Sequence, residues 1–251
     1  MIVGIIPARY ASTRLIGKPL VDIGGKPMIQ HTYESAKKSK LLSDVIIAVD
    51  DERVYSTAKM FGANVIMTPR ELSTGTDRIA YVAKKLTTAE IIVNIQGDEP
   101  FIPGKMIDQA IEPLLFDRNV EVATLVKRIT DVKELNSPSI PKVVFDYHNY
   151  ALYFSRAAIP YLRDITSDKK KLKYADIYKH IGLYVFRKEQ LLNFTKMKQT
   201  DVEKFETLEQ LRLLENGIKI KVVVTEEESL SVDTKEELEE ARLFYKSLKD
   251  K

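Results

Sequence analysis

The sequence contains no cysteine. This absence excludes disulfide bonds, thiolate metal sites and a cysteine nucleophile, and it fits a reducing compartment. Net charge is also small, because 39 basic residues stand against 36 acidic ones in a chain of 251 residues. We therefore do not expect a nucleic-acid-binding protein that works by bulk charge, and any anion-binding site must be local.

Long hydrophobic runs are missing as well. No apolar stretch approaches the roughly 20 residues that span a bilayer. The first apolar run, Ile2–Ile6, follows no basic segment and is soon interrupted by Arg9. We expect no membrane segment, no signal peptide and a cytoplasmic location. No internal repeat or low-complexity linker is present, so we predict one domain that covers residues 1–251.

Two common phosphate-binding motifs are absent. A Walker loop needs glycine five residues before its Gly-Lys pair and serine or threonine after it. Around Gly17-Lys18, these places hold Ser12 and Pro19. No G-x-G-x-x-G pattern follows a strand, so a dinucleotide-binding fold of the usual kind is not expected.

The N-terminal stretch nevertheless has the composition of a phosphate site. Ile2–Ile6 is long enough for one buried strand, and we expect Pro7 to end it. Three cations follow on a loop, namely Arg9, Arg14 and Lys18. These cations are spaced among small residues: Ala8, Ala11, Ser12, Thr13 and Gly17. In open α/β sheets ligands bind at the carboxyl ends of the strands, so we interpret the loop as a nucleoside triphosphate site. The alternative is a solvated turn with scattered charges.

A second loop is acidic. Glu90–Ile95 is predicted as a buried strand that ends in Gln-Gly-Asp-Glu-Pro. A carboxylate at the tip of a central strand requires a positive partner, and beside a triphosphate Mg²⁺ fits, because it prefers hard oxygen ligands. Asp98 is the better ligand, whereas Glu99 is interpreted as a cap for the helix expected at Pro103–Phe116. A turn acid without a metal is the alternative.

Strands and helices alternate through the first half of the chain. Further strands are predicted at Asp44–Asp50, Val65–Met67 and Glu121–Lys127, and helices begin at Pro27 and at Glu52. This alternation of buried strands and amphipathic helices is typical of an α/β fold with a mostly parallel sheet.

Two helix starts have more than one interpretation. Ser73–Arg78 (STGTDR) offers Thr74 or Thr76 as a cap, and its hydroxyl and N–H groups also suit a base or a phosphate. Asp233 or Thr234 caps the last helix, and Asp233 is otherwise available as a ligand.

The second half changes character. Lys142–Asp146 and Ala151–Phe154 flank a turn and predict a hairpin, to which Lys179–Phe186 returns as a further strand. We interpret about 142–186 as an inserted β-hairpin arm for dimer contact. One helix is predicted from about Val202 to Glu215, stopped by Asn216-Gly217, and the last strand at Ile218–Thr225.

These motifs together resemble one family, the 3-deoxy-manno-octulosonate cytidylyltransferases, also called CMP-Kdo synthetases. The matching stretches are PARYASTRLIGKPL, GKPMIQH, STGTDR, NIQGDEP, KVVFDYHNYALYFSRAAIP, YKHIGLYVFR, LEQLRLLENGIKIKV and VDTKEEL. They run from Ile2 to about Glu240, which is nearly the whole chain. The first and fourth are general to sugar nucleotidyltransferases, whereas the hairpin, KHIGLY and LEQLR blocks narrow the likeness to this family.

The resemblance implies a nucleotide-diphosphosugar-transferase-like α/β fold, a homodimer, and the conversion of CTP and Kdo to CMP-Kdo and pyrophosphate for lipopolysaccharide synthesis. It implies catalytic roles for Arg9, Lys18, Asp98 and Asp233, with Mg²⁺ on Asp98 and Asp233. The implied nucleotide contacts are Ala8, Arg9, Ser12, Arg14, Lys18, Ser73, Thr74, Gly75, Thr76 and Arg78. The implied sugar contacts are Gln96, Arg156, His180, Tyr184, Glu209 and Gln210, with Arg156 facing the sugar carboxylate. From the residues alone, Arg156 could equally be a structural ion pair, and His180 a strand residue.

Two positions depart from the family pattern. Ile16 stands where proline is common, and Ser231 stands where glycine is frequent, near the expected sugar and metal. CMP transfer to 8-amino-Kdo or to another acidic sugar is therefore an alternative. A non-catalytic regulator that binds nucleotide is an alternative from a different class.

Overall fold

The computed structural model of the chain describes residues 1–11 and 15–249. Contacts divide the chain into two compact units. Unit 1 comprises Met1–Asp108, Phe186–Thr195 and Glu227–Lys251, and unit 2 comprises Gln109–Val185 and Lys196–Glu226. The predicted arm, about 142–186, lies almost wholly in unit 2, which also holds chain before and after it. The sequence indicated no separate second unit, and the prediction of one domain over 1–251 stays a prediction.

Unit 1 is built on a parallel sheet. Its strands lie in the order β6 (Ile91–Asn94), β1 (Ile2–Ala8), β4 (Asp44–Val49) and β5 (Asn64–Met67). Apolar side chains on both faces of β1 are buried, as its unbroken β-branched run predicts. The predicted α/β fold with a mostly parallel sheet is confirmed here.

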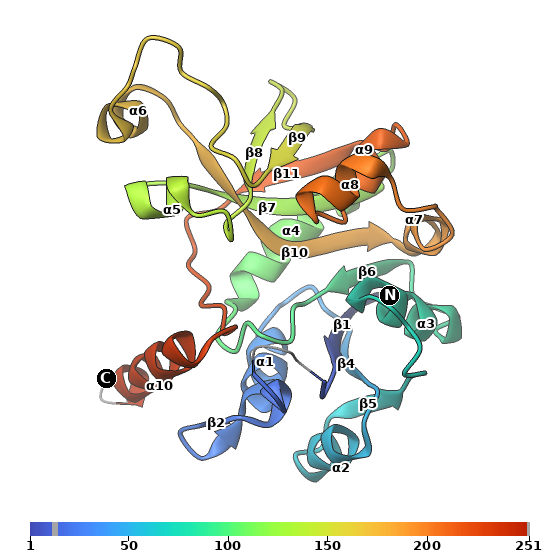
Figure 1. Cartoon of the computed structure of the whole chain (residues 1–251). Coiled ribbons are helices and arrows are strands. Elements are labelled where there is room, and N and C mark those ends of the chain that lie inside the picture. The colour runs from blue at the N-terminus through green and yellow to red at the C-terminus, as the bar shows by residue number, and fades with distance from the viewer. Residues whose placement is uncertain (12–14, 250–251) are drawn as a thin grey trace. The chain divides into compact units, whose positions relative to one another are not determined.

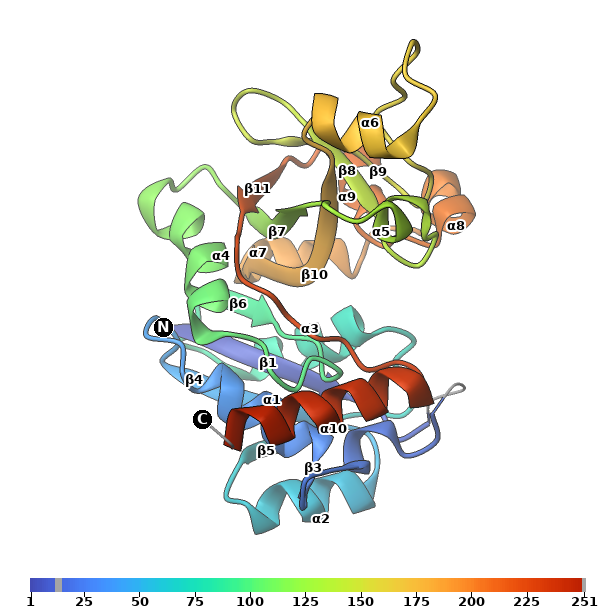
Figure 2. The same ribbon diagram turned by 90° about the vertical axis from the view of Figure 1, so that its left-hand side faces the viewer.

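Helices cover both faces of this sheet. α1 (Met28–Ala36) and α2 (Glu52–Met60) lie on one face, and α3 (Gly75–Lys85) lies on the other (Figures 1 and 2). The strand order reverses between β1 and β6, because the chain moves from β1 outward to β5 and then returns to the opposite side of β1. Such a switch point is where open α/β sheets bind ligands, at the carboxyl ends of the strands.

Further elements complete unit 1. They are the 3₁₀ turn η1 (Lys18–Leu20), the ribbon of β2 (Asp22–Ile23) and β3 (Lys26–Pro27), α7 (Lys188–Phe194) and α10 (Lys235–Lys249). The C-terminal helix α10 packs beside β2 and α1 (Figure 2), where Tyr245 meets the His31 ring at 4.7 Å. Among the helices in the described ranges, none has the length and hydrophobicity that crossing a membrane requires.

Unit 2 contains parallel and antiparallel pairs. β11 (Ile220–Val224) pairs parallel with β7 (Val122–Arg128), which neighbours β10 (Tyr178–Arg187); the last two residues of β10 belong to unit 1. β8 (Lys142–Phe145) pairs antiparallel with β9 (Ala151–Ser155) and with β10, which confirms the predicted hairpin and returning strand. The helices of unit 2 are α5 (Val132–Asn136), α6 (Asp168–Tyr174), α8 (Asp201–Glu206) and α9 (Leu211–Glu215). α4 (Gly104–Phe116) begins in unit 1 and ends in unit 2.

Three predictions about local structure are wrong. Strand β1 was expected to end at Pro7, but it continues to Ala8 by pairing with β4. Proline is tolerated there because β1 pairs with β6 only up to Ile5, so the edge of β1 where Pro7 lacks an N–H has no partner strand in this pairing. Pro27 lies at the N-cap position before α1 rather than inside the helix. The single helix expected up to Glu215 is two helices, because Thr207 adopts a left-handed conformation with φ 52°.

Candidate functional site

Two loops meet at the switch point of the unit 1 sheet. One follows β1 and carries Arg9 and Lys18, and the other follows β6 and carries Gln96–Glu99. Gly97 marks their close approach, since a Cβ there would lie 2.7 Å from the Pro7 carbonyl oxygen. Only glycine fits this contact, so the QGDEP glycine is required to bring the two loops together.

The central contact of this site joins three charged residues. The Lys18 Nζ atom lies 2.6 Å from Asp98 Oδ2 and 2.6 Å from Asp233 Oδ1. The two carboxylate oxygens are therefore at most twice that distance apart, although 135 positions separate them in the sequence. The predicted meeting of Asp98 and Asp233 is present, and their carboxylates already converge on one cation.

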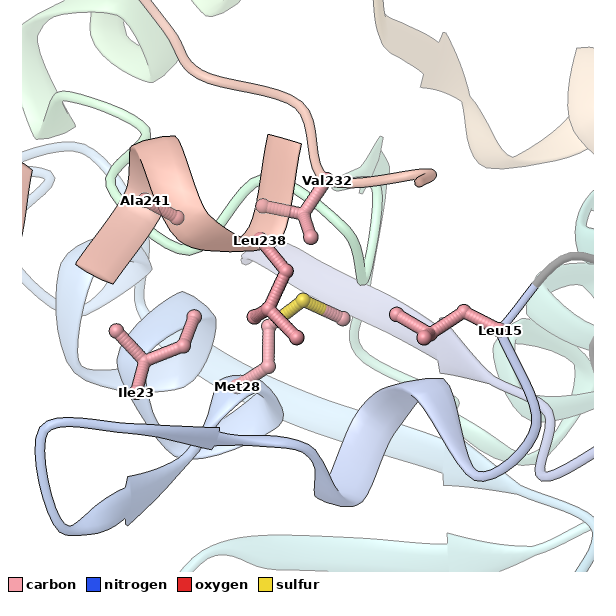
Figure 3. Packing of buried hydrophobic residues seen from close by; sticks show 6 residues of the cluster. All are labelled: Leu15, Ile23, Met28, Val232, Leu238 and Ala241. Atoms are coloured by element: carbon pink, nitrogen blue, oxygen red, sulfur yellow. The ribbon is translucent and has the colours of Figure 1, made fainter. Parts of the chain in front are cut away.

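A hydrophobic cluster brings Asp233 to this place. Val232, Leu238 and Ala241 from the C-terminal segment pack against Leu15, Ile23 and Met28 from the N-terminal segment (Figure 3). A backbone hydrogen bond from the Val232 N–H to the Asp98 carbonyl oxygen, at 2.9 Å, holds the segment before α10 against the loop that follows β6. Burial of these apolar side chains thus determines where the neighbouring carboxylate of Asp233 lies.

Thr234, not Asp233, caps the last helix. The Thr234 hydroxyl accepts the N–H of Glu237 at 3.2 Å, and the Glu237 carboxylate accepts the N–H groups of Asp233 and Thr234. This reciprocal pattern is a capping box. Because Thr234 supplies the cap, the Asp233 side chain is available to bind Lys18.

A cavity of about 1030 Å³ opens beside these carboxylates. Seven residues of the predicted site contribute to its wall: Ala8, Arg9, Lys18, Gly75, Gln96, Asp98 and Asp233. Its other lining residues are Pro7, Tyr10, Ala11, Ile16, Pro19, Met28 and Gly97. A cavity of this size accommodates a nucleotide. Ser12 and Arg14, also predicted here, lie outside the residues that the structure describes.

Arg9 is oriented from two sides. Its Nη1 donates to the Ser73 carbonyl oxygen at 3.1 Å, and its Nε lies 3.6 Å from Asp50 Oδ2. The other Asp50 oxygen accepts the N–H of Tyr10 at 3.2 Å. The loop after β1 is therefore pinned to the carboxyl end of β4, with the Arg9 side chain still 44% exposed and able to meet an anion.

Arg78 lies elsewhere than predicted. Its side chain is fully buried, and its Nη2 donates to Asp50 Oδ2 at 3.0 Å. Its Nη1 donates to the Thr68 hydroxyl and to the Pro69 carbonyl oxygen. The structure does not place Arg78 in the cavity wall, and its role there is to neutralise Asp50 beneath the loop of Arg9.

The rest of the STGTDR segment builds the start of α3. The Thr74 hydroxyl accepts the Asp77 N–H at 3.0 Å, and Asp77 Oδ2 accepts the Thr74 N–H, so Thr74 rather than Thr76 is the cap. Thr76 is buried in the first turn. The segment contributes Gly75 to the cavity, and Ser73 contributes its carbonyl oxygen to Arg9.

Five of the predicted sugar contacts belong to unit 2, and Gln96 belongs to unit 1. The His180 Nε2 atom lies 3.0 Å from the Thr124 hydroxyl, and its ring packs between Phe154 and Tyr184. Desolvation lowers the pKa of His180 to about 3 and raises that of Tyr184 well above 10. Both side chains are therefore uncharged at neutral pH and act through hydrogen bonds.

Arg156 uses its guanidinium group on the protein itself. Nε donates to the Glu206 carbonyl oxygen at 2.6 Å, Nη2 to that of Thr207 at 3.1 Å, and Nη1 to that of Pro138 at 2.8 Å. An arginine has five N–H donors, so each terminal nitrogen retains a second N–H. After Thr207 and Leu208 come Glu209 and Gln210, in the turn that precedes α9.

Two acidic residues were not predicted to have a role, and a third has a role other than the one expected. Asp50 and Glu206 hold the two arginines described above, and Glu99 is buried with its Oε2 accepting the Ser229 hydroxyl at 2.9 Å. Burial, with the nearby Asp98, raises the pKa of Glu99 to about 7. Asp50 had a usable signal, because it ends an apolar strand at the same sheet edge as Arg9. Glu99 was expected as a helix cap, and this expectation is wrong, since its carboxylate bonds to Ser229.

The protein supplies only part of a metal site. Within the residues that the structure describes, no three acidic or histidine side chains group closely enough to hold a metal by themselves. Mg²⁺ commonly takes one or two carboxylates and completes its shell with substrate phosphates and water. The Lys18 ammonium between Asp98 and Asp233 shows that this pair of carboxylates is arranged for a cation, so the donor set fits Mg²⁺.

Comparisons with known proteins show the family of the chain. A family model described as Cytidylyltransferase matches residues 3–220. The chain is 52% identical to the 3-deoxy-manno-octulosonate cytidylyltransferase of Geotalea uraniireducens (strain Rf4), over 95% of this chain and 96% of the relative. It is 50% identical to that of Geobacter sulfurreducens (strain ATCC 51573 / DSM 12127 / PCA), over 95% and 96%.

Solved structures give the same picture. The chain is similar to a CMP:2-keto-3-deoxy-manno-octonic acid synthetase complexed with CTP, with a TM-score of 0.91, 40% identity and 98% of both chains covered. A 4-diphosphocytidyl-2C-methyl-D-erythritol synthase from Anaerococcus prevotii DSM 20548 has a TM-score of 0.64 at 16% identity over 98% of both chains, which shows a common fold.

Proposed function

This chain belongs to the 3-deoxy-manno-octulosonate cytidylyltransferase family, and we propose that it joins CTP and 3-deoxy-D-manno-octulosonate (Kdo) to give CMP-Kdo and pyrophosphate. It is a nucleotidyltransferase. One observation carries the proposal: the carboxylates of Asp98 and Asp233 converge on a cation in the wall of a nucleotide-sized cavity that also presents Arg9.

The chemistry assigns roles to these residues. The anomeric oxygen of the sugar attacks the α-phosphorus of CTP, its proton leaves to solvent, and the bond from phosphorus to the pyrophosphate oxygen breaks. Negative charge builds on the phosphoryl oxygens and on the leaving pyrophosphate, so positioning and neutralisation dominate catalysis. We assign Arg9 and Lys18 to the triphosphate, where their positive charges stabilise the leaving group. The backbone around Ala8 and Gly75 is small enough to let the nucleotide approach.

We further propose that Asp98 and Asp233 hold Mg²⁺ in the working enzyme. Mg²⁺ bound there supplies charge neutralisation and lowers the pKa of a coordinated hydroxyl group. Support comes from the convergence of the two carboxylates on Lys18 and from the hard oxygen donors that they provide. Apolar packing around Val232 and the hydrogen bond from its N–H to the Asp98 carbonyl oxygen hold together the two segments that carry these acids.

For the sugar, we assign Gln96, Arg156, His180, Tyr184, Glu209 and Gln210. The second N–H on each terminal nitrogen of Arg156 suits the carboxylate of an α-keto acid sugar, which a planar guanidinium matches bidentately. The uncharged His180 and Tyr184 suit sugar hydroxyl groups. Hydrogen bonds of this kind discriminate strongly among substrates when the site is built for them.

The two alternatives from the sequence are not favoured. The similar proteins carry the name of the Kdo enzyme rather than that of an 8-amino-Kdo or sialic acid enzyme. A non-catalytic regulator would be favoured by the loss of a charged residue of the site, and Arg9, Lys18, Asp98 and Asp233 are all present. Ser231 remains the position at which sugar preference can be tested.

We propose a homodimer that works in the cytoplasm and serves lipopolysaccharide synthesis. Support for a homodimer comes from large apolar side chains that unit 2 exposes, among them Leu152, Tyr161 and Phe205. A second copy of the chain would remove such side chains from water. Sedimentation of the purified chain distinguishes a dimer from a monomer.

The experiment that tests the function is pyrophosphate release from CTP, measured with and without Kdo and with and without Mg²⁺. We expect release only when CTP, Kdo and Mg²⁺ are all present, and CMP-Kdo as the second product. Kdo and 8-amino-Kdo are compared at equal concentrations. If the protein bound nucleotide but showed no sugar-dependent release of pyrophosphate, the non-catalytic regulator would be the better explanation. If pyrophosphate release were faster with 8-amino-Kdo than with Kdo, 8-amino-Kdo would be the substrate.

A further inference from the structure

Lys142 is a buried lysine that the proposed reaction does not use. It lies at the start of β8 in unit 2, and its side chain is 0% exposed. Its Nζ donates to three backbone carbonyl oxygens: Ser137 at 2.8 Å, Ile140 at 2.7 Å and Arg156 at 2.7 Å. Only the charged ammonium form has three N–H donors, so this geometry describes a buried positive charge.

Structural packing alone gives a poor reason for this charge. Moving an ammonium group out of water is costly, and an apolar side chain of similar length would fill the same volume without that cost. What an apolar side chain cannot do is bind three carbonyl oxygens at once. Lys142 therefore joins the loop 137–140 to the backbone of Arg156, the residue that follows β9.

Arg156 binds the same loop through a further carbonyl oxygen. Its Nη1 donates to the Pro138 carbonyl oxygen, which lies between the two loop carbonyls that Lys142 binds. The carboxylate of Glu206 accepts the Ser155 hydroxyl at 2.6 Å and the Arg156 N–H at 2.9 Å. Lys142 and Arg156 thus bind the same loop. Glu206, the last residue of α8, in turn binds Ser155 and the backbone of Arg156.

The same network reaches the turn that carries two proposed sugar contacts. The Arg156 guanidinium holds the carbonyl oxygens of Glu206 and Thr207, and Thr207 is the left-handed residue at which α8 ends. Leu208 is buried, and Glu209 and Gln210 follow it directly. Any shift of the guanidinium therefore moves the turn from which Glu209 and Gln210 project.

We propose that Lys142 is a positioning residue for the acidic sugar: its ammonium group fixes the Arg156 segment and, through Arg156, the turn that bears Glu209 and Gln210. The proposal rests on the proposed function, because it concerns the sugar side of that reaction. The guanidinium group of Arg156, which this network holds in place, is the group that suits the sugar carboxylate.

The test separates positioning from folding. We compare wild-type protein, Lys142→Met and the control Lys221→Met, and measure KM for Kdo, KM for CTP, kcat and the thermal midpoint. Lys221 is a suitable control, because it also lies in unit 2 and donates to one backbone carbonyl oxygen, that of His148. For Lys142→Met we expect KM for Kdo to rise about tenfold or more, because small displacements of binding groups are costly. KM for CTP stays within about twofold, and the control changes neither KM.

Two results would overturn the proposal. One is an unchanged KM for Kdo in folded Lys142→Met. The other is an equal rise of both KM values together with a lower thermal midpoint, which marks a merely structural role. If Lys142→Met yields no folded protein, Lys142→Gln takes its place, since it keeps two donors without the charge, and the same results decide. Failure of the proposed function differs from all of these, because wild-type protein would then show no Kdo-dependent pyrophosphate release.

Discussion

Lys18 serves as an internal counter-ion for Asp98 and Asp233, and its removal has a calculable effect on stability. Its side chain is 13% exposed, and those of the two acids are 27% and 32% exposed. Lys18→Met keeps the apolar stem but leaves two carboxylates facing each other at no more than twice the 2.6 Å contact distance. At an effective dielectric constant near 20, two charges at such a separation repel by about 3 kcal/mol.

Solvent reduces this figure, because both acids are partly exposed and the side chains can turn apart. We expect Lys18→Met to lower the free energy of unfolding by about 2 kcal/mol at neutral pH without divalent metal. A second substitution, Asp98→Asn, removes one of the repelling charges, so the double variant should recover most of this loss. Mg²⁺ should also restore stability to Lys18→Met.

Urea denaturation followed by circular dichroism measures these differences. The matched control is Lys26→Met, because Lys26 pairs with Glu34 at 2.7 Å while both side chains are more exposed, at 38% and 42%. Its loss should cost no more than about 1 kcal/mol and should not respond to Mg²⁺. The reasoning is refuted if Lys18→Met is as stable as wild type, or if adding Asp98→Asn brings no recovery.

Three further predictions concern the same unit. Asp98→Asn and Asp233→Asn should each lower kcat by about a hundredfold, because each removes one charge contact at the reacting phosphate, while circular dichroism spectra stay unchanged; wild-type-like rates in either would remove its assignment. Gly97→Ala should lower the free energy of unfolding by about 1–3 kcal/mol, because its Cβ meets the Pro7 carbonyl oxygen, and calorimetry that shows no change would contradict the tight approach. Burial raises the pKa of Glu99 from 4.5 to about 7, so the folded state holds a proton that the unfolded state has released, and wild-type stability should fall as pH rises through that window. The Glu99→Gln variant should lack this fall, which is at most about 3 kcal/mol, and parallel pH–stability curves for the two proteins would argue against a buried proton.

The parallel sheet of unit 1 was predictable because its strands are buried on both faces and therefore appear as unbroken apolar runs. The ligand edge was predictable for the same reason, since Arg9 and Asp98 come directly after two such runs. The Asp233 contact required the family resemblance, because no local pattern indicates that α10 packs on the N-terminal segment. That packing joins apolar side chains far apart in the sequence, such as Met28 and Leu238, which are 210 positions apart.

What sequence reasoning missed depends on tertiary contacts. A run that favours helix extends across Thr207, and threonine rarely adopts a left-handed conformation, so nothing local indicated the break before Glu209. The family resemblance implied that Arg78 contacts the nucleotide, yet its side chain is buried and binds Asp50, which directly follows β4. The sequence indicated no more for Lys142 than a place in a strand, since its three carbonyl partners belong to a loop and to the residue that follows β9.

Metal binding tests most directly whether Asp98 and Asp233 form a cation site. Mn²⁺ is a suitable probe, because bound and free ions are distinguished by electron paramagnetic resonance. Titrations of wild type, Asp98→Asn and Asp233→Asn in the presence of CTP are corrected for Mn²⁺ held by CTP alone. We predict that wild-type protein binds one or more Mn²⁺ ions beyond those held by CTP. In each variant, the affinity for Mn²⁺ should be weaker by about tenfold or more. Equal Mn²⁺ binding by all three proteins would contradict the assignment.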